Sequence, residues 1–417
     1  MNKNKIIFEN SYILTMNENN DIVFGDMIIK DGKISNIIEK EPQNDTVSRV
    51  IMPSLYNLHV HLGETIFRGY CDGMTLFEYL DVSHDSYKNE EWMQMEKEIH
   101  HLSGMVTLME LIKEGCGTVV CSRGWEEVEQ CGIHGYCLFP IVDIDKLRNY
   151  YNDIVSLTSM KLKTENKNVK NSIFIQSLYL SSEEKLDYVA GCMNSNPDIK
   201  LFIHIAETQK EMVYVMQKYG CSPIELLQKK GLLNERVFCV HCIYLSDNDI
   251  QLLKKTGTNV VLCPISNLKL KDGYPNVEKL LEVGIKIIVA TDGFATNNSA
   301  SLFEELKMIG IMSYEHIDEN ELLKMITTNP AEALYGEKSG QIYEGADGNV
   351  SVFEMPGYSS VNPQKIVNNM IYNYTSVKCT SVICEGEEVM ANGVFKSFNE
   401  NELINEYNSL LIKLFRE

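Results

Sequence analysis

The chain has 417 residues, of which 44% are hydrophobic and 23% are charged, proportions that are ordinary for a globular protein. The formal net charge of −20 argues against nucleic acid or an anionic membrane as a partner, because phosphate groups would be repelled. The twelve cysteines follow no disulfide-framework spacing, and neither a signal peptide nor an apolar run of about eighteen residues is visible. We therefore expect reduced thiols, a cytoplasmic location and no membrane span.

The first segment, residues 5–39, consists of short apolar stretches separated by turn residues. Ile6–Phe8, Tyr12–Leu14, Ile22–Phe24 and Met27–Ile29 alternate with turn signals such as Lys30–Lys33. This pattern is typical of β-strands, and no helical period accompanies it. We expect residues 1–52 to contribute to a small β module.

The sequence pattern changes from Pro53 onward, where short apolar runs alternate with stretches of helical periodicity. Apolar residues between 92 and 114 recur every three or four positions, which predicts an amphipathic helix that stops at Gly115. Further helices are expected over 209–219, 222–230, 246–255 and 275–283. The apolar runs, which suit strands buried on both faces, are the stretch holding His59, 117–121, 136–139, 173–175, 201–204, 237–241, 259–263 and 286–290.

About eight β/α units over 53–344 predict an α/β fold of the (β/α)8 TIM-barrel type. An open doubly wound sheet is the alternative, but no glycine-rich phosphate turn marks a switch point. Residues 345–397 return to strand-and-turn texture and are expected to form a composite β-sandwich with residues 1–52. Residues 398–417 are predicted to form a terminal helix.

Histidine and aspartate side chains end four of the predicted strands. His59 and His61 lie two residues apart, so both imidazoles face the same side of a strand. His204 and His241 end later strands, and Asp292 follows the last apolar run. Because the working residues of a barrel gather at the C-terminal ends of its strands, His59, His61, His204 and Asp292 are candidate ligands of one divalent metal.

Glu207 follows His204 by three residues and therefore faces the opposite side of a straight strand. The two side chains converge only if the chain turns after His204. Such a turn would place the Glu207 carboxylate near the metal site without making it a ligand, which is where a general base belongs.

A set of motifs around these residues resembles the amidohydrolase superfamily, and within it the branch of aminohydrolases and triazine hydrolases. The motifs are Pro53–His61, Phe67–Gly69, His204–Thr208, Val240–Cys242, Cys263–Asn267 and Thr291–Asn298. The resemblance covers nearly the whole chain. It implies a barrel with a β-sandwich made from both termini, and a small-molecule substrate processed by a homodimer.

The resemblance also implies the chemistry. One zinc ion, or iron in some members, would be held by His59, His61, His204 and Asp292. It would lower the pKa of a water molecule toward neutrality. Glu207 would move protons, with His241 and Asp292 helping to orient or deprotonate the water. The fourth strand ends without the lysine that binuclear relatives carboxylate, which favours a single metal.

The substrate is the open question. The histidine that adenosine-type deaminases carry near the fourth strand is absent from Ser177–Ser181. Glu64 lies where a small or apolar residue is usual, and it either binds a substrate amine or caps a loop. We expect substrate contacts from Glu64, Tyr79, Ser177 and Asn297.

Three functions follow from these expectations. The favoured one is deamination of a purine, pterin or related N-heterocycle. The second is a triazine-type hydrolase that releases a halide or amine, or a cyclic amidase, on the same site. The third is a metal-free scaffold, against which the intact ligand set and acid/base pair weigh.

Overall fold

The structure, a computed structural model, describes residues 5–42, 47–86, 89–122, 124–141, 168–356 and 362–415. Its centre is a sheet of eight strands that run parallel and lie side by side in chain order. These strands are β5 (Leu55–Val60), β6 (Cys116–Ser122), β7 (His134–Ile141), β8 (Val169–Ile175), β9 (Leu201–Ile205), β10 (Val237–His241), β11 (Asn259–Leu262) and β12 (Ile287–Val289). Each lies on one of the predicted apolar runs.

The first and last strands of this sheet meet and close a ring at their C-terminal ends. The backbone N–H of Asp292 donates to the carbonyl oxygen of His59 over 3.0 Å. Beside it, Asn57 Nδ2 donates to Thr291 Oγ1 over 2.7 Å, and Thr291 N–H donates to Asn57 Oδ1 over 3.2 Å. We call these contacts the seam. The barrel prediction is confirmed.

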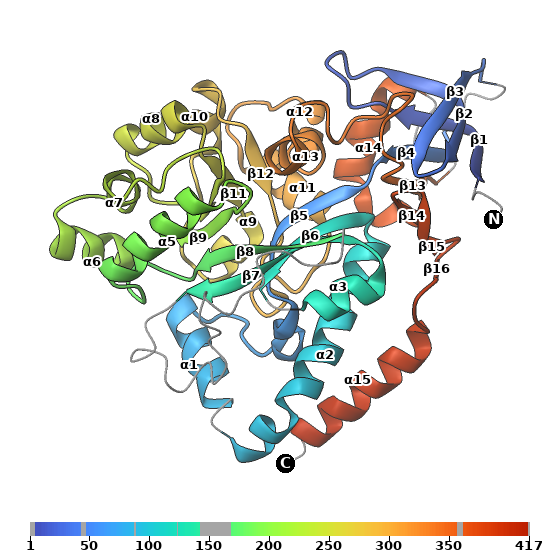
Figure 1. The fold of residues 1–417 in the computed structure, drawn as a ribbon. Coiled ribbons are helices and arrows are strands. Elements are labelled where there is room, and N and C mark those ends of the chain that lie inside the picture. The colour runs from blue at the N-terminus through green and yellow to red at the C-terminus, as the bar shows by residue number, and fades with distance from the viewer. Residues whose placement is uncertain are drawn as a thin grey trace.

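Helices cover the outside of the barrel, which explains why its strands are almost wholly buried (Figure 1). α2 (Glu90–Lys113) starts where Asn89 caps it by accepting from two backbone N–H groups. α8 (Asp247–Thr256) starts after the predicted Ser246, whose side chain forms a reciprocal cap with Asp249. The remaining barrel helices are α1 (Leu76–Ser86), α3 (Trp125–Cys131), α5 (Glu183–Ser195), α6 (Gln209–Tyr219), α7 (Pro223–Lys229), α9 (Pro264–Lys269), α10 (Val277–Glu282), α11 (Leu302–Met312), α12 (Glu319–Lys324) and α13 (Thr328–Tyr335).

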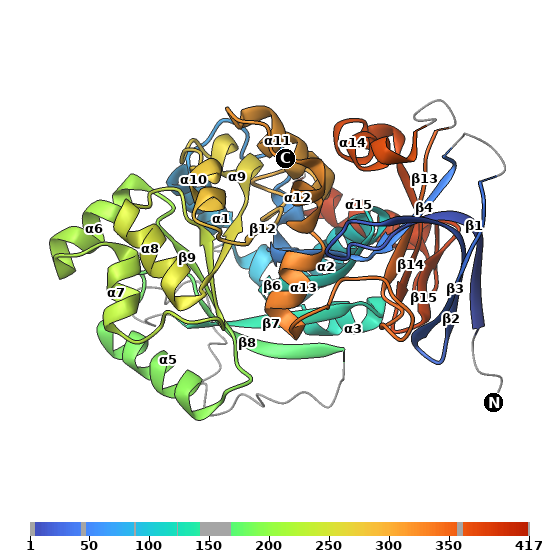
Figure 2. The ribbon, with the colours of Figure 1, turned by 90° about the horizontal axis from the view of Figure 1, so that it is seen from above.

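A second sheet of eight strands joins the two ends of the chain, as Figure 2 shows from above. β4 and β13 pair antiparallel, with Val350 opposite Pro53, and thereby link the N-terminal and C-terminal halves. The strands of this sheet are β1 (Lys5–Leu14), β2 (Ile22–Lys30), β3 (Lys33–Glu39), β4 (Arg49–Pro53), β13 (Val350–Glu354), β14 (Lys378–Cys384), β15 (Glu387–Ala391) and β16 (Val394–Phe395). The composite sheet confirms that both termini build one β module, whereas the domain boundaries at 52, 344 and 397 stay predictions.

The segment expected to hold only strands and turns also contains a helix, α14 (Ile366–Tyr372). Its buried residues Ile366, Val367, Met370 and Ile371 recur with helical spacing, and α14 packs against α11 and α12. This period is too short to stand out from sequence alone. The terminal helix α15 (Glu400–Leu414) packs along α2 and is tied to it by an ion pair between Lys113 and Glu400 (Figure 1).

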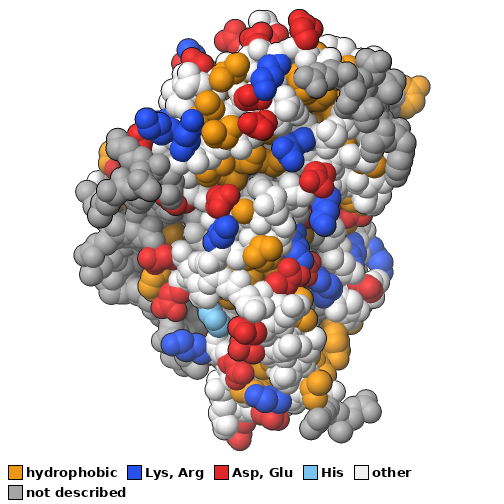
Figure 3. Space-filling model, turned by 90° about the vertical axis from the view of Figure 1, so that its right-hand side faces the viewer, with side chains coloured by type: hydrophobic (Ala, Val, Ile, Leu, Met, Phe, Trp, Pro, Cys, Tyr) orange, Lys and Arg blue, Asp and Glu red, His pale blue; other side chains and the backbone are white. Residues whose placement is uncertain are grey.

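Two surface properties complete the fold. Acidic and basic side chains are interspersed among the described residues on the face shown in Figure 3, so the net negative charge is not gathered there into one field. Within the described part of the chain, none of the helices combines the length and the apolar character needed to cross a bilayer.

Candidate functional site

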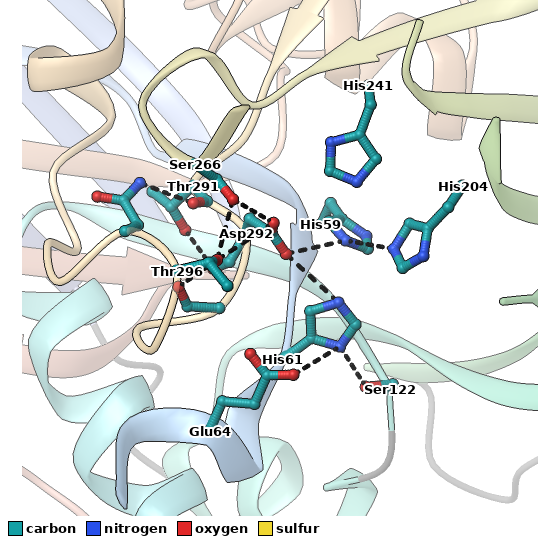
Figure 4. Close-up of polar contacts among 12 residues, drawn as sticks. His59, His61, Glu64, Ser122, His204, His241, Ser266, Thr291, Asp292 and Thr296 are labelled. Atoms are coloured by element: carbon teal, nitrogen blue, oxygen red, sulfur yellow. Dashed lines mark hydrogen bonds and ion pairs between the residues drawn. The ribbon is translucent and has the colours of Figure 1, made fainter. Parts of the chain in front are cut away.

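Three histidines and an aspartate converge at the C-terminal end of the barrel (Figure 4). Nε2 of His204 lies 3.0 Å from Nε2 of His59. Oδ1 of Asp292 lies 3.3 Å from Nε2 of His59 and 3.3 Å from Nε2 of His61. The structure therefore brings together all four predicted metal ligands.

The protonation states of these groups suit a metal. Burial lowers the pKa of His59 to about 4 and holds the pKa of His204 well below its usual range, so both imidazoles are neutral and offer lone pairs. Burial alone would raise the pKa of Asp292, but its hydrogen bond to His59 and the nearby histidines hold that pKa well below its usual range. Donor atoms 3.0–3.3 Å apart match the ligand spacing around a cation with bonds of about 2.0–2.1 Å. The residues present fit a divalent metal.

Left-handed backbone occurs at three positions at or just after the ends of β9, β10 and β12. Ala206, His241 and Asp292 have φ angles of 51°, 76° and 63°. Such conformations are costly for residues other than glycine and are often stored at functional sites. The turn at Ala206 is the one that the spacing of His204 and Glu207 requires.

Glu207 lies beside the four-residue cluster. Its Oε1 is 3.5 Å from Nε2 of His241, whose Nδ1 lies 2.8 Å from Oδ1 of Asn267. The side chains of His204, Glu207 and His241 are also close enough to share a cation, so distance alone does not separate Glu207 from the ligands. Burial, followed by the charge of Asp292, raises the pKa of Glu207 to about 8, which keeps this carboxyl able to take and return a proton near neutrality.

Three further residues, for which the sequence predicts no role, hydrogen-bond to Asp292 or to the backbone of Glu207. Oδ2 of Asp292 accepts from Ser266 Oγ over 2.6 Å and from Thr296 Oγ1 over 3.3 Å. Oε2 of Glu211 accepts from the backbone N–H of Glu207 over 3.0 Å, which fixes the turn after β9. Ser266 lies within the motif Cys263–Asn267, but nothing in its spacing indicates that its hydroxyl reaches Asp292.

A cavity of about 160 Å³ opens beside the cluster, and His61 and Phe174 form part of its wall. Two of the predicted substrate contacts, Glu64 and Tyr79, also line it. The two side chains interact: burial is the main cause that raises the pKa of Tyr79 well above its usual value, and the charge of Glu64 is the second. Burial likewise raises the pKa of Glu64 to about 6.

The other two predicted substrate contacts lie elsewhere. Asn297 is buried behind the Asp292 loop, where its Nδ2 donates to the carbonyl oxygen of Thr291 and to Glu305. Its amide nitrogen is thus committed to the loop, and a substrate contact from Asn297 stays a prediction. Ser177 is 2% exposed and is not among the described residues that line the cavity.

Asp272 also lies near the site, although the sequence predicts no role for it. It follows α9, its side chain is largely buried, and its Oδ2 has no hydrogen-bond partner among the described residues. Burial, followed by the charge of Glu207, raises its pKa to about 8. Asp272 therefore belongs to the electrostatic environment of the site.

Known proteins resemble the chain over nearly its whole length. The model of the amidohydrolase family matches residues 50–389. A 5-methylthioadenosine/S-adenosylhomocysteine deaminase from Acetivibrio thermocellus is 30% identical, with 95% of this chain and 96% of the relative covered. A 5'-deoxyadenosine deaminase from Methanosarcina acetivorans is 28% identical, with 96% of each chain covered. Among solved structures, an adenosine deaminase from Xanthomonas campestris with bound zinc is 19% identical and superimposes with a TM-score of 0.82 over 98% of both chains.

Proposed function

Because the chain belongs to the amidohydrolase family, we propose that it is a metal-dependent hydrolase that releases ammonia from an amino-substituted purine, pterin or related N-heterocycle. The observation that carries this proposal is the convergence of His59, His61, His204 and Asp292 beside a cavity, with Glu207 adjacent. The deaminase names of these two relatives support the reaction type.

We assign His59, His61, His204 and Asp292 as the ligands of one divalent cation, with zinc favoured and iron as the alternative. Three imidazole nitrogens and one carboxylate oxygen form a donor set that suits either metal. A cation held there supplies a Lewis acid that lowers the pKa of water toward neutrality.

The protein's own groups then move the protons. Glu207 takes a proton from the attacking water and returns it to the ring nitrogen. It then takes the remaining proton of the hydroxyl group on the ring carbon and delivers it to the amino group; the C–N bond breaks, ammonia leaves and a carbonyl remains. His241, whose ring is oriented by Asn267, hydrogen-bonds and orients the water. Asp292 keeps its charge because its hydrogen bond to His59 and the nearby histidines favour the carboxylate, whose Oδ2 also accepts from Ser266 and Thr296. Glu64 and Tyr79 form the wall that the heterocycle contacts.

Metal analysis and an ammonia-release panel test this function. The purified protein is expected to contain about one equivalent of zinc or iron per chain and to release ammonia from at least one purine, pterin or pyrimidine. Less than about 0.3 equivalents of metal in folded protein would contradict it. Release of chloride or an alkylamine from a triazine, or opening of a cyclic amide, without any ammonia would replace the deaminase by the alternative hydrolase.

We also propose a cytoplasmic homodimer. All twelve cysteines are free, which supports a reducing compartment. The dimer is carried over from the family resemblance, and light scattering coupled to size-exclusion chromatography tests it.

A further inference from the structure

Four aromatic rings form a cluster behind one wall of the metal-site cavity. Phe67 lines the cavity, and its ring stacks on that of Trp92 with 5.6 Å between centroids and 22° between planes. Trp92 is buried at the start of α2 and is not among the described residues that line the cavity. The Trp92 ring therefore supports the Phe67 ring from outside the cavity.

Phe415, the residue after the terminal helix α15, completes this cluster. Its ring meets that of Trp92 edge-on, with 5.6 Å between centroids and 85° between planes, and stacks on that of Tyr70 at 4.6 Å. Tyr70 belongs to the same turn as Phe67, because its backbone N–H donates to the Phe67 carbonyl oxygen over 3.0 Å. Stacked and edge-on pairs at such separations are the arrangements that aromatic rings favour. Phe415 thus connects the start of α2 to the turn that carries Phe67.

The packing of α15 along α2 brings Phe415 to this place. Lys113 at the end of α2 pairs with Glu400 at the start of α15, and Lys413 at the end of α15 lies 3.8 Å from Glu98 of α2. The two helices therefore run antiparallel, and the end of α15 lies beside the first half of α2 (Figure 1). Because partly exposed ion pairs contribute little stability on their own, the buried side chains of α15 and the ring cluster hold the helix in place.

The first half of α2 also belongs to the cavity wall. Glu96 and His100 line the cavity and follow Trp92 by one and two steps of four residues, which places all three on one side of the helix. A shift of Trp92 would therefore move two parts of the wall at once, the Phe67 ring and this side of α2.

The metal ligand that precedes this wall in sequence is fixed independently. His61 follows β5 directly, and the carbonyl oxygen of the next residue, Leu62, accepts from the Thr107 hydroxyl over 3.0 Å. Thr107 lies in the second half of α2, away from Trp92. A shift of the ring cluster should therefore alter the wall while leaving the metal ligands in place.

We propose that Phe415 is a positioning residue of the proposed active site, because its ring fixes Trp92 and, through it, the wall that Phe67 and the first half of α2 present to the heterocycle. The inference rests on the proposed function, since it concerns how that site fits its substrate. Removal of the Phe415 ring leaves a space beside Trp92 that the neighbouring side chains fill only in part. The wall then loses its fixed shape and substrate binding weakens, whereas the chemical step continues.

Steady-state kinetics on the metal-loaded full chain test this role. Phe415→Ala should raise the KM of a heterocycle that the wild-type protein deaminates by about 3- to 10-fold, while kcat and metal content change by less than about 2-fold. Phe415→Tyr keeps the ring and should restore the wild-type KM. Ile412→Ala is the matched control, because it removes an apolar side chain that is 51% exposed from the same helix, and it should leave KM unchanged.

Tryptophan fluorescence gives a second measurement, which needs no substrate. The chain has two tryptophans, so a Trp125→Phe background leaves Trp92 as the single emitter. Because Trp92 is 5% exposed, Phe415→Ala should move its emission to longer wavelength and increase its quenching by acrylamide. Phe415→Tyr and Ile412→Ala should keep the wild-type spectrum.

A wild-type KM in Phe415→Ala, a fall in kcat without a rise in KM, an equal rise of KM in Ile412→Ala, or an unchanged Trp92 spectrum would each overturn the inference. Ammonia release by the wild-type protein would leave the proposed deaminase intact in all four cases. Failure of the metal-loaded wild-type protein to release ammonia would refute the proposed function itself, and this inference with it.

Circular dichroism checks that the variants fold. If Phe415→Ala does not fold, Tyr70→Ala takes its place, because it removes the ring stacked on Phe415 from a side chain that is 53% exposed. The same rise in KM is expected there, and a wild-type KM would overturn the inference.

Discussion

Removing the hydroxyl of Ser266 should weaken metal binding without touching a metal ligand. This hydroxyl donates over 2.6 Å to Oδ2 of Asp292, whose Oδ1 faces His59 and His61. Ser266 is completely buried, so water does not replace the lost donor in Ser266→Ala. Thr296 then remains as the only side-chain donor to Oδ2 among the described residues, at 3.3 Å.

The expected loss is about 10- to 100-fold in metal affinity, the usual effect of deleting a group that orients a ligand. That corresponds to about 1.4–2.8 kcal/mol, in agreement with one hydrogen bond to a charged group. Competition with a chromophoric zinc chelator measures the affinity, and circular dichroism checks the fold. Thr296→Ser, which keeps a hydroxyl, is the control and should lose less than about 3-fold. Wild-type affinity in folded Ser266→Ala would refute the reasoning that Asp292 binds the metal in a form fixed by Ser266.

Three further outcomes are expected. Glu207→Gln should keep its metal but lose about 10²- to 10⁴-fold in kcat, and near-normal turnover in an ammonia assay would remove Glu207 from its role. Chelation should lower the Tm by several degrees, because a ligand present at about 100 times its Kd stabilises the fold by about 2.7 kcal/mol; an unchanged Tm in calorimetry would contradict a bound metal. Burial raises the pKa of Glu211 to about 8. Between about pH 5 and 8 the folded metal-free protein therefore holds a proton that the unfolded chain has released. The free energy of unfolding should fall by up to about 1.4 kcal/mol for each unit by which the pH rises through this range. Glu211→Gln should reduce that slope in urea titrations at pH 6, 7 and 8, and an unchanged slope would assign the proton to another group.

The strands of the barrel could be located from sequence because each is buried on both faces and therefore forms an apolar run. The same argument placed His59, His204 and His241 at strand ends, and the structure brings them together. The helix α14 was missed because its apolar face spans less than two turns.

The supporting residues could not be predicted in the same way, because their roles depend on contacts between distant loops. Ser266 reaches Asp292 across 26 positions, and Asp272 gains its environment only when its loop lies beside Glu207. Asn297 belongs to a motif near the cluster, so sequence proximity favoured a substrate contact. Only the packing shows that its amide nitrogen donates hydrogen bonds to Thr291 and Glu305.

The seam couples closure of the barrel to assembly of the metal site. Asn57 and Thr291, which are 234 positions apart, bond across it, and a ligand follows each of them by one or two residues. A chain that has not yet joined its first and last strands therefore has no complete site, however well its other helices and strands have formed. Contacts this far apart in sequence form late and slowly. A cation held by His59 and Asp292 would tie together the two strands that meet at the seam, so metal binding should stabilise the closed barrel.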